Sequence, residues 1–481
     1  MTGLDLILLA MVITGSFVLR AMPSIRKPEF GNDAYYHLLV ARSIRTHRRF
    51  PEKDTGMVPE GPRGYPPFFH LLLVPFAGRF EKLAKRAVSP SIDAVTIALV
   101  FLFSESVGIS EPIWPTLIFA LSPICVLQST SLNPRPLSCL ILVVSMLSIF
   151  WYWSTEAALA LIAALVFESL MFLTHKMGVQ ALVAAHIAVS VVIALDDLMT
   201  GVLAAAVLPC AFLVAVGLTR GAYLRTTLKD HIGFIRVHIK HGDYRTGRKG
   251  LPSPMELLKS DPVSYAAPVA GLYLLIEGSS SMELEFLVAW ALGVFLLSQF
   301  WMLGDSWRHL AFGNVPSSII SVMFVYHLVG SDWEGGLLLL LLTVALVAAT
   351  LIQLKRALRS DIAQTIVNGI RGLPPEWKER LRGTFIYSNA VHNAVPLETG
   401  ARLLGGNPNA IGVEFSLELH SANKRSLAEV AKLADRTVGS EPEYYVVFER
   451  LSYPDTAGYT RIFESDEIRI LVREVRTTLG A

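Results

Sequence analysis

The residues best suited to chemistry lie in a polar segment just after the first apolar stretch of the chain. Asp33, in the sequence GNDAYYHLL, is followed by Tyr36 and His37 and then by several arginines. A carboxylate held at this point can act as a general base, taking the proton of a substrate hydroxyl as a bond forms. It can equally cap the helix that follows, because a capping aspartate accepts hydrogen bonds from free backbone amides. Residue spacing does not separate these two interpretations.

Groups that bind phosphate recur at the ends of later apolar stretches. Arginine offers paired hydrogen bonds to phosphate oxygens, and lysine offers a point charge. These candidate substrate-binding residues are Arg135, His175, Lys176, Arg308 and His309. Arg308 is favoured because residues 304–305 and His309 give it a polar setting between two apolar stretches. The alternative is that such cations only reach out of the apolar layer toward lipid headgroups.

One carboxylate lies inside an apolar stretch. Glu168 precedes His175 by seven residues, so a helix would place both side chains on one face, two turns apart. An ionisable group inside a bilayer is costly and is typically functional. Glu168 is therefore a further substrate-binding candidate, as are Tyr36 and His37. The alternative for Glu168 is a structural glutamate that is protonated or paired between helices, and His186 is better explained as structural.

Membrane helices are the elements that must position these residues. The chain of 481 residues is 52% hydrophobic and 17% charged, whereas soluble domains carry about 25% charged residues. A spanning helix needs about 20 apolar residues. Eleven spans are predicted near residues 4–22, 89–107, 113–131, 137–154, 156–174, 177–195, 198–218, 262–277, 284–303, 314–330 and 336–354. The stretch 65–78 is shorter and contains three prolines, which favours an interfacial or re-entrant helix over a twelfth span.

A second unit follows the last predicted span. Residues 1–355 are predicted to form the membrane domain and residues 356–481 a small soluble α/β domain. Short apolar runs predict strands at 385–389, 444–448 and 468–472, and helical spacing of apolar residues predicts a helix over 426–437.

The remaining patterns limit cofactors and partners. Cys125, Cys139 and Cys210 lie in or next to apolar runs without metal-binding spacing, so neither a disulfide framework nor structural zinc is expected. The first loop has one convincing carboxylate and no DxD motif, which leaves a divalent metal such as Mg or Mn unsupported but open. The basic loop 219–261, which includes Arg245 and Arg248, mixes apolar and cationic residues. This composition suits anionic membrane lipids rather than nucleic acid.

Several motifs together resemble the GT-C superfamily of membrane glycosyltransferases. GNDAYYHLLVARSI and GYPPFFHLLL resemble the first external loop of that superfamily. Supporting motifs are ALSP at 120–123 with Arg135-Pro136, LTH at 173–175, WRHL at 307–310, and the C-terminal IYSN, LETGARLLGG, YYVVF and IFESDEIRI. The resemblance implies a multi-span enzyme that takes sugars from polyisoprenyl-phosphate carriers and needs an acidic residue just after the first membrane helix. Asp33 occupies that position.

Within the superfamily, the DAYYHL pattern is similar to catalytic subunits of oligosaccharyltransferase and, more distantly, to protein mannosyltransferases. The WWDYG motif by which oligosaccharyltransferases read a glycosylation sequon is absent. A monosaccharide transferase is therefore preferred.

The predicted function is transfer of a sugar from a polyisoprenyl-phosphate donor to a lipid, glycan or protein acceptor at the external face of the cell membrane. Asp33 would act as base or orienter, while Arg308, Arg135 and the His175–Lys176 pair would stabilise the departing phosphate. Alternatives are a transporter or lipid flippase with Glu168 and His186 along its pathway, and a non-catalytic scaffold that binds lipid-linked glycans.

The predicted sidedness rests on two conflicting criteria. Nearly all Lys- and Arg-rich loops share one face, which the positive-inside rule assigns to the cytoplasm. The family resemblance assigns this face to the outside, and a face that binds lipid phosphates has its own reason to be basic. The external assignment is therefore preferred.

Overall fold

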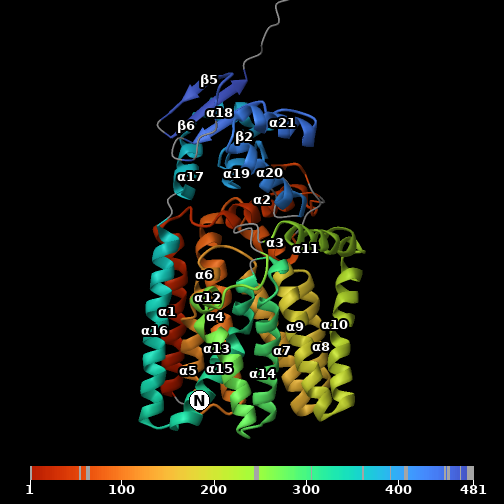
Figure 1. Ribbon diagram of the computed structural model, residues 1–481, viewed down its shortest axis with the longest axis vertical. Helices are drawn as coiled ribbons and strands as arrows, with labels where there is room; N and C mark the ends of the chain where they lie inside the picture. The colour runs from red at the N-terminus through yellow and green to blue at the C-terminus, as the bar shows by residue number, and fades with distance from the viewer. Residues whose placement is uncertain are drawn as a thin grey trace, which may run out of the picture.

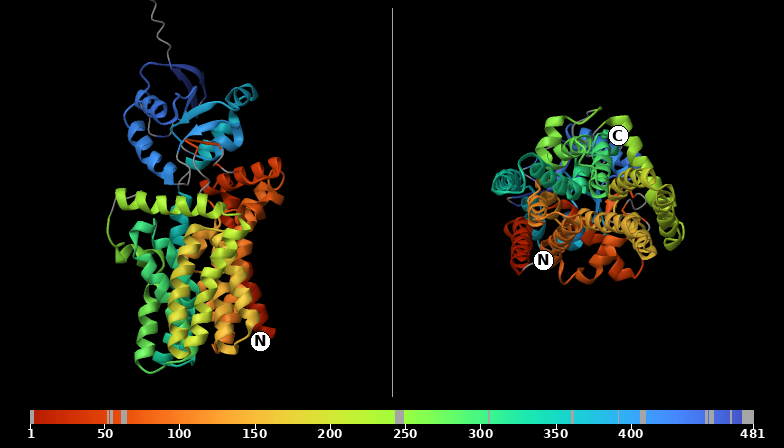
Figure 2. Two further views of the ribbon diagram at one scale, coloured as in Figure 1. Left: turned by 90° about the vertical axis from the view of Figure 1, so that its right-hand side faces the viewer. Right: turned by 90° about the horizontal axis from the view of Figure 1, so that it is seen from below.

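A computed structural model describes residues 3–473 except 52, 54–55, 61–64, 243–248, 305, 360–361, 391, 406–409, 449–450, 452–454 and 466. It has two parts, a bundle of long helices and a small sheet that stands at one end of the bundle (Figure 1). Short helices lie between the two parts, roughly across the axis of the bundle (Figure 2).

The bundle contains the predicted membrane spans. Within the described ranges, seven helices have the length and hydropathy of spanning helices. They are α1 (Gly3–Arg26), α4 (Glu81–Ser106), α7 (Arg135–Thr155), α9 (Lys176–Asp196), α10 (Leu198–Leu218), α15 (Leu310–Val329) and α16 (Trp333–Leu358). Shorter apolar helices complete the bundle, namely α5 (Ile113–Ala120), α6 (Pro123–Ser129), α8 (Ala158–Phe172), α13 (Pro262–Ile276) and α14 (Met282–Ser298). Each predicted span coincides with one of these helices or with the α5–α6 pair.

Two of the predicted spans are shorter or more broken than their hydropathy indicates. The span expected over 113–131 divides into α5 and α6 because the Ser122 hydroxyl caps a new helix, accepting from the Cys125 amide at 3.4 Å. Pro123 stands at the first position of that helix, where its missing N–H costs nothing. The span expected over 284–303 stops at Ser298, and a separate 3-10 turn occupies Trp301–Leu303.

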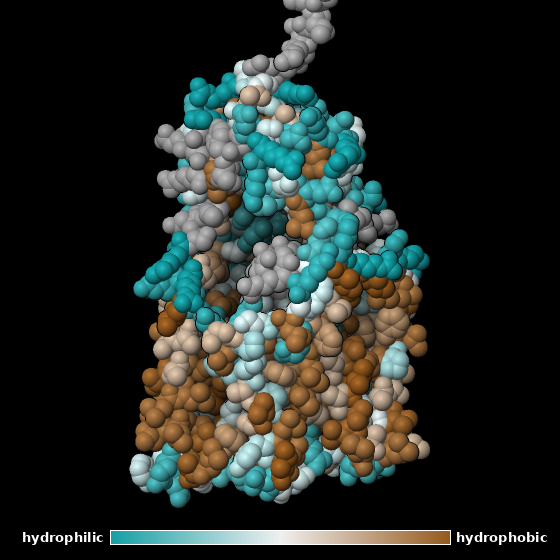
Figure 3. Space-filling model, in the orientation of Figure 1, coloured by the Kyte–Doolittle hydropathy of each residue, from teal (hydrophilic) through white to brown (hydrophobic). Residues whose placement is uncertain are grey.

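The outer surface of the bundle is a hydrophobic band with hydrophilic rims (Figure 3). Large apolar side chains on its outer helices are exposed, including Leu159, Leu213 and Val344. Contiguous apolar surface on this scale indicates contact with lipid rather than water.

The stretch 65–78 does not cross the bundle, as the sequence predicted. It forms α3 (Phe68–Leu73) and a 3-10 turn at Val74–Phe76, and six helical residues rise only about 9 Å. It packs against α2 (Asn32–His47) at the end that carries the sheet. The surface helix α11 (Lys229–His241) lies at the same end (Figure 2), so the first loop and the basic loop share one face.

The sheet has six strands in the order β1-β3-β2-β4-β6-β5. They are β1 (Met57–Val58), β2 (Phe385–Ser388), β3 (Arg402–Leu404), β4 (Tyr444–Phe448), β5 (Tyr459–Glu464) and β6 (Ile468–Arg473). The first four in spatial order are parallel, and β6 and β5 add an antiparallel edge.

Helices cover both faces of the sheet, which makes the C-terminal unit the predicted α/β fold. One face packs on α17 (Ile362–Gly372) and α18 (Pro375–Leu381), and the other on α20 (Ala410–Asn423) and α21 (Leu427–Val438). The predicted strands at 385–389, 444–448 and 468–472 correspond to β2, β4 and β6, and the predicted helix to α21.

The edge strand β1 comes from the first loop and not from the C-terminal unit. Met57 and Val58 pair with Leu403 and Leu404 of β3. The predicted domain limits of 1–355 and 356–481 stay a prediction, but the sheet is completed only when the first loop supplies this strand.

Candidate functional site

The start of α2 places Asp33 beside the loop that precedes α7. Gly31 has φ of 91°, and a Cβ built on it would lie 2.6 Å from the Ser131 Cβ. Only glycine combines this left-handed conformation with so close an approach. Gly31 is the residue at the N-cap of α2, which has no side-chain capping bond, and Asp33 belongs to the first helical turn. Asp33 is therefore not the N-cap residue of α2.

Asp33 is instead half exposed and faces a cation. Its Oδ2 lies 3.7 Å from Nη2 of Arg135, whose side chain is 14% exposed. Arg135 is the first residue of α7, and the Asn133 side chain accepts from its amide at 3.0 Å. The Arg135 Nε is buried with no hydrogen-bond partner among the described residues. A donor in that condition is available for a ligand oxygen.

His37 lies one turn beyond Asp33 and is held in a single neutral tautomer. Nδ1 of His70 lies 3.3 Å from the Pro66 carbonyl, which can only accept, so in a neutral His70 ring the other nitrogen is an acceptor. That nitrogen is 3.0 Å from Nδ1 of His37, which must then donate. Burial, and to a smaller degree the Arg135 guanidinium, lower the pKa of His37 to about 3. Its Nε2 is thus an unprotonated acceptor, buried and without a partner among the described residues.

Aromatic rings connect His37 to His175. Tyr65 packs edge-on against the His37 ring at a centroid distance of 5.2 Å and lies 5.9 Å from the His175 ring. Tyr36 packs against the same Tyr65 ring at 5.4 Å, so it lines this cluster as an aromatic side chain. His175, just before α9, is buried and its Nδ1 has no described partner. Burial and the nearby Arg135 lower the pKa of His175 well below its usual value.

The other predicted cations lie on the same face and are tied to α9 and α11. Lys176 forms an ion pair with the buried Asp230 of α11. His309 lies 2.9 Å from the Gln180 side chain, which also contacts His231 at 3.0 Å. Asp230 is a residue that sequence reasoning did not single out, and it neutralises part of the predicted basic cluster.

Arg308 is partly buried in the 3-10 turn that leads into α15. Its guanidinium lies 5.3 Å from the Trp307 ring centroid, and its carbonyl accepts from Gln128 at 3.3 Å. Asp305, which was expected to contribute to its polar setting, lies outside the described residues, as do Arg245 and Arg248 of the basic loop.

Glu168 belongs to a separate polar cluster inside the bundle. Ser145 donates to its Oε1 at 2.9 Å, and Nδ1 of His186 lies 2.8 Å from the same oxygen. The other nitrogen of His186 is 3.0 Å from the Ala204 carbonyl. These contacts join α7, α8, α9 and α10, which favours the structural alternative for Glu168 and agrees with the structural interpretation of His186.

A second buried pair inside the bundle was not anticipated. Arg20 of α1 contacts Asp93 of α4 at 2.6 Å, and both side chains are almost fully buried. Ser129 of α6 also donates to Asp93. Arg20 was counted only as part of the predicted span 4–22, because one arginine within an apolar run gives no sign of the residue that it contacts.

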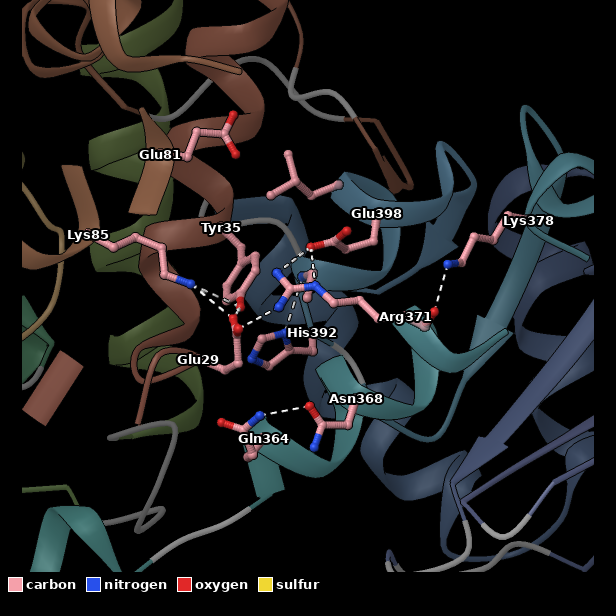
Figure 4. Close-up of polar contacts among 12 residues, drawn as sticks. Glu29, Tyr35, Glu81, Lys85, Gln364, Asn368, Arg371, Lys378, His392 and Glu398 are labelled. Atoms are coloured by element: carbon pink, nitrogen blue, oxygen red, sulfur yellow. Dashed lines mark hydrogen bonds and ion pairs between the residues drawn. The ribbon is translucent and has the colours of Figure 1, made fainter. Parts of the chain in front are cut away.

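A polar network fastens the first loop to the C-terminal unit (Figure 4). Glu29 receives hydrogen bonds from Lys85 of α4 at 3.0 Å, from the Tyr35 hydroxyl and from Arg371 of α17. Arg371 also contacts Glu398 of α19 (Ala394–Thr399) at 2.8 Å. Sequence reasoning missed this network because its members are far apart in the chain and have no motif in common.

The network brings a further part of the C-terminal unit to the site. Oδ1 of Asn32, the residue before Asp33, accepts from the Asn393 amide at 3.0 Å. The His392 ring packs edge-on against Tyr35 at a centroid distance of 5.3 Å. The site therefore combines the first loop, the ends of several bundle helices and the segment between β2 and α19.

This arrangement suits an anionic, hydroxyl-bearing ligand. Arg135 offers a buried N–H to a phosphate oxygen, His37 offers an acceptor to a hydroxyl, and Asp33 offers a carboxylate in contact with solvent. Within the described ranges, no group of three His, Cys, Asp or Glu side chains is arranged to hold a metal ion.

No protein-family model matches the chain, and no curated protein matches it. The chain is a multi-pass membrane protein with the GT-C fold, as its motifs predicted.

The particular likeness is to ArnT from Cupriavidus metallidurans. Its crystal structure bound to undecaprenyl phosphate matches with a TM-score of 0.56 at 11% identity, over 98% of this chain and 99% of that chain. The apo structure matches with a TM-score of 0.52 at 10% identity, over 92% and 93%. At these identities the likeness shows the fold alone.

Proposed function

We propose that this protein is a membrane glycosyltransferase that moves a sugar from a polyisoprenyl-phosphate carrier to a hydroxyl group of a lipid, glycan or protein acceptor. The observation that carries the proposal is the pairing of Asp33 with Arg135 next to buried polar atoms that have no described partner. The likeness to a structure that holds undecaprenyl phosphate supports the class of carrier.

Arg135 would bind the phosphate of the carrier. Its Nε is buried near the end of the bundle, where a lipid phosphate would meet the apolar layer. In such a partly dry site a charge-assisted hydrogen bond is stronger than in water. As the bond between the sugar and the phosphate breaks, negative charge grows on the phosphate, and a guanidinium held in place stabilises it. Arg308 would add positive potential on the same face, whereas the charge of Lys176 is offset by its ion pair with Asp230.

Asp33 and His37 would act on the acceptor. The acceptor oxygen attacks the anomeric carbon, the bond from that carbon to the phosphate oxygen breaks, and the hydroxyl proton passes to Asp33. Because Asp33 is half exposed, the proton can leave to solvent afterwards. His37 presents an unprotonated Nε2 one helical turn away, which can accept a hydrogen bond from a second hydroxyl of the acceptor.

The active face would be the external face of the membrane. The first loop, the cationic helix ends and the C-terminal sheet share one end of the bundle (Figure 1). The positive-inside rule would place this end in the cytoplasm, but the cations there also have a role in binding lipid phosphate.

The experiment that tests the proposal is a transfer assay with Asp33→Asn. Membranes containing each variant are supplied with a panel of radiolabelled polyprenyl-phosphate sugars, and labelled product is counted. Asp33→Asn keeps the side-chain size but cannot take a proton, so transfer is expected to fall at least about a hundredfold, in line with loss of a general base. The matched control is Asp332→Asn, an exposed carboxylate between α15 and α16 at the other end of the bundle. Undiminished transfer by Asp33→Asn would reject the proposed role.

A further inference from the structure

The described residues that follow β2, namely 389–390 and 392–393, lie where open α/β sheets bind ligands. From β2 the chain passes to β3, on one side of β2, and then crosses to β4, on the other side of β2. These three strands are parallel. Such a change of direction leaves a crevice at the carboxyl ends of the strands. Asn389, directly after β2, bridges to β4 by accepting from the Phe448 amide at 2.8 Å and donating to its carbonyl at 3.1 Å.

This segment is held against the start of α2. Oδ1 of Asn32 accepts from both the backbone amide and the side-chain Nδ2 of Asn393, at 3.0 and 3.2 Å. Further along α2, Arg42 donates to the Leu397 carbonyl of α19 at 3.1 Å. Figure 4 shows the His392 ring lying close to Tyr35, Glu29 and Arg371. The carboxyl edge of the sheet therefore faces the residues around Asp33.

Two adjacent residues of this segment have buried polar atoms without a described partner. His392 is 6% exposed, and its Nδ1 accepts from the Ala394 amide at 3.1 Å. The proton of the neutral ring must then be on Nε2, which is a donor with no partner among the described residues. Asn393 is 9% exposed. Because its Nδ2 donates to Asn32, its Oδ1 is an acceptor, and this atom also has no described partner.

The chemistry of this pair differs from that of the phosphate-binding cations. Burial is the main reason that the pKa of His392 falls to about 4, so the ring is a neutral donor at physiological pH. A phosphate oxygen only accepts hydrogen bonds and would leave the Asn393 oxygen unsatisfied. A hydroxyl group both donates and accepts, and a sugar ring carries several of them. Buried polar atoms without partners are costly, and such a ligand would satisfy both.

We propose that His392 and Asn393 of the C-terminal unit bind sugar hydroxyls beside Asp33, with His392 Nε2 donating and Asn393 Oδ1 accepting. The inference rests on the proposed function and deepens it, because it makes the C-terminal sheet part of the sugar-binding site. The sugar can belong to the lipid-linked donor or to a glycan acceptor.

The test measures sugar-dependent binding by the purified full-length protein. In the first arm, dissociation constants are measured for undecaprenyl phosphate and for undecaprenyl phosphate linked to a panel of pentoses and hexoses. In the second arm, a panel of methyl glycosides is titrated in the presence of saturating undecaprenyl phosphate. His392→Phe keeps a ring and removes the donor, whereas His392→Gln keeps an N–H near the position of Nε2. His327→Phe, an exposed position near the C-terminal end of α15, is the matched control.

His392→Phe is expected to weaken sugar-dependent binding roughly tenfold, the loss of one buried hydrogen bond, and to change binding of sugar-free undecaprenyl phosphate less than twofold. His392→Gln should restore most of the loss. A loss in the first arm assigns the hydroxyls to the donor sugar, and a loss in the second assigns them to the acceptor.

The proposal is overturned if the wild type shows no sugar-dependent binding in either arm. It is also overturned if His392→Phe leaves that binding intact or weakens sugar-free lipid binding equally. A wild-type protein that does not bind undecaprenyl phosphate at all would contradict the proposed function itself.

Discussion

At the residue scale, Arg135 connects the carboxylate that is proposed to act on the acceptor with the atoms that are proposed to bind the carrier phosphate. One of its nitrogens lies 3.7 Å from the Asp33 carboxylate, and its buried Nε has no described partner. The same guanidinium also contributes to lowering the pKa of His37 and His175. Arg135 thus adds to the effect of burial on both histidines while remaining able to bind an anion.

Replacing Arg135 with lysine should therefore show how much of the phosphate binding depends on positive charge alone and how much on the planar shape of the guanidinium. Lysine keeps the positive charge but lacks the planar fork that binds two oxygens at once. We expect Arg135→Lys to weaken binding of undecaprenyl phosphate roughly tenfold or more, since a charge-assisted hydrogen bond contributes about 1.5–3 kcal/mol. Binding to the purified protein by isothermal titration checks this. Arg382→Lys, at an exposed surface position, should bind as the wild type does, and equal binding by Arg135→Lys would exclude Arg135 as a phosphate ligand.

At the element scale, the position of α2 decides whether the site exists. Its first residue contacts the C-terminal unit through Asn393, and its N-cap approaches the loop before α7 so closely that only glycine fits. Asp33 lies two residues after this N-cap glycine. The helix is thus fixed at its start from two sides, which is what brings a loop carboxylate to the end of α7.

Gly31→Ala tests this positioning directly. A Cβ would overlap the Ser131 Cβ at 2.6 Å and force a left-handed conformation on alanine, a strain of about 1–3 kcal/mol. We expect transfer activity to fall at least about tenfold while the protein still purifies as a folded monodisperse species. Gly336→Ala, in α16 where a Cβ meets nothing within 4 Å, serves as control. Full activity in Gly31→Ala would mean that the start of α2 need not be held there.

The elements themselves were largely predictable from the sequence, and their contacts were not. Apolar length predicts a span because the bilayer demands it, and β2, β4 and β6 were visible as short apolar runs. The break between α5 and α6 depends on one serine cap and one proline inside a continuous apolar run. The strand β1 has only two residues, and its partner β3 lies more than 300 residues away. Neither feature has a periodicity that a sequence pattern can detect.

The candidate site was predictable only as a set of residues on one face. Asp33, Arg135 and His175 were identified because acidic and basic groups at helix ends are chemically distinctive. Glu168 was included on the same reasoning, but its partners Ser145 and His186 are in neighbouring helices. His392 was not considered, because a single histidine in a soluble domain gives no signal until its tautomer and burial are known.

At the scale of the whole molecule, the polar chemistry is gathered at one end of an apolar bundle. The first loop crosses from the membrane part to complete the sheet, and the Glu29 network fastens α4 to α17 and α19. The two parts are therefore joined by a strand, by buried ion pairs and by side-chain contacts around Asn32. A ligand at this junction touches both.

Stability should depend on pH because buried histidines are kept neutral at this junction. Burial lowers the pKa of His37 to about 3 and that of His392 to about 4, whereas an unfolded chain has about 6.5. The unfolded state then binds more protons in this range, so stability is full above about pH 6.5 and is lost as pH falls toward 4.

Thermal unfolding of the detergent-solubilised protein between pH 7.5 and 4.5 measures this effect. The midpoint should fall with pH, and His392→Gln should show a smaller fall than the wild type. The exposed His420→Gln should follow the wild type. A wild-type midpoint that rises or stays level across this range would contradict the neutral, buried state of these rings.

The central claim is that a lipid-linked phosphate binds between the first loop, the start of α7 and the segment before α9. Photo-crosslinking with a polyprenyl phosphate that carries a diazirine near the phosphate, followed by peptide mapping, tests it most directly. We predict crosslinks near Asp33 to His37, near Arg135 and near His175, and their loss when excess undecaprenyl phosphate competes. Crosslinks confined to the opposite end of the bundle, or spread evenly over its apolar surface, would contradict the account.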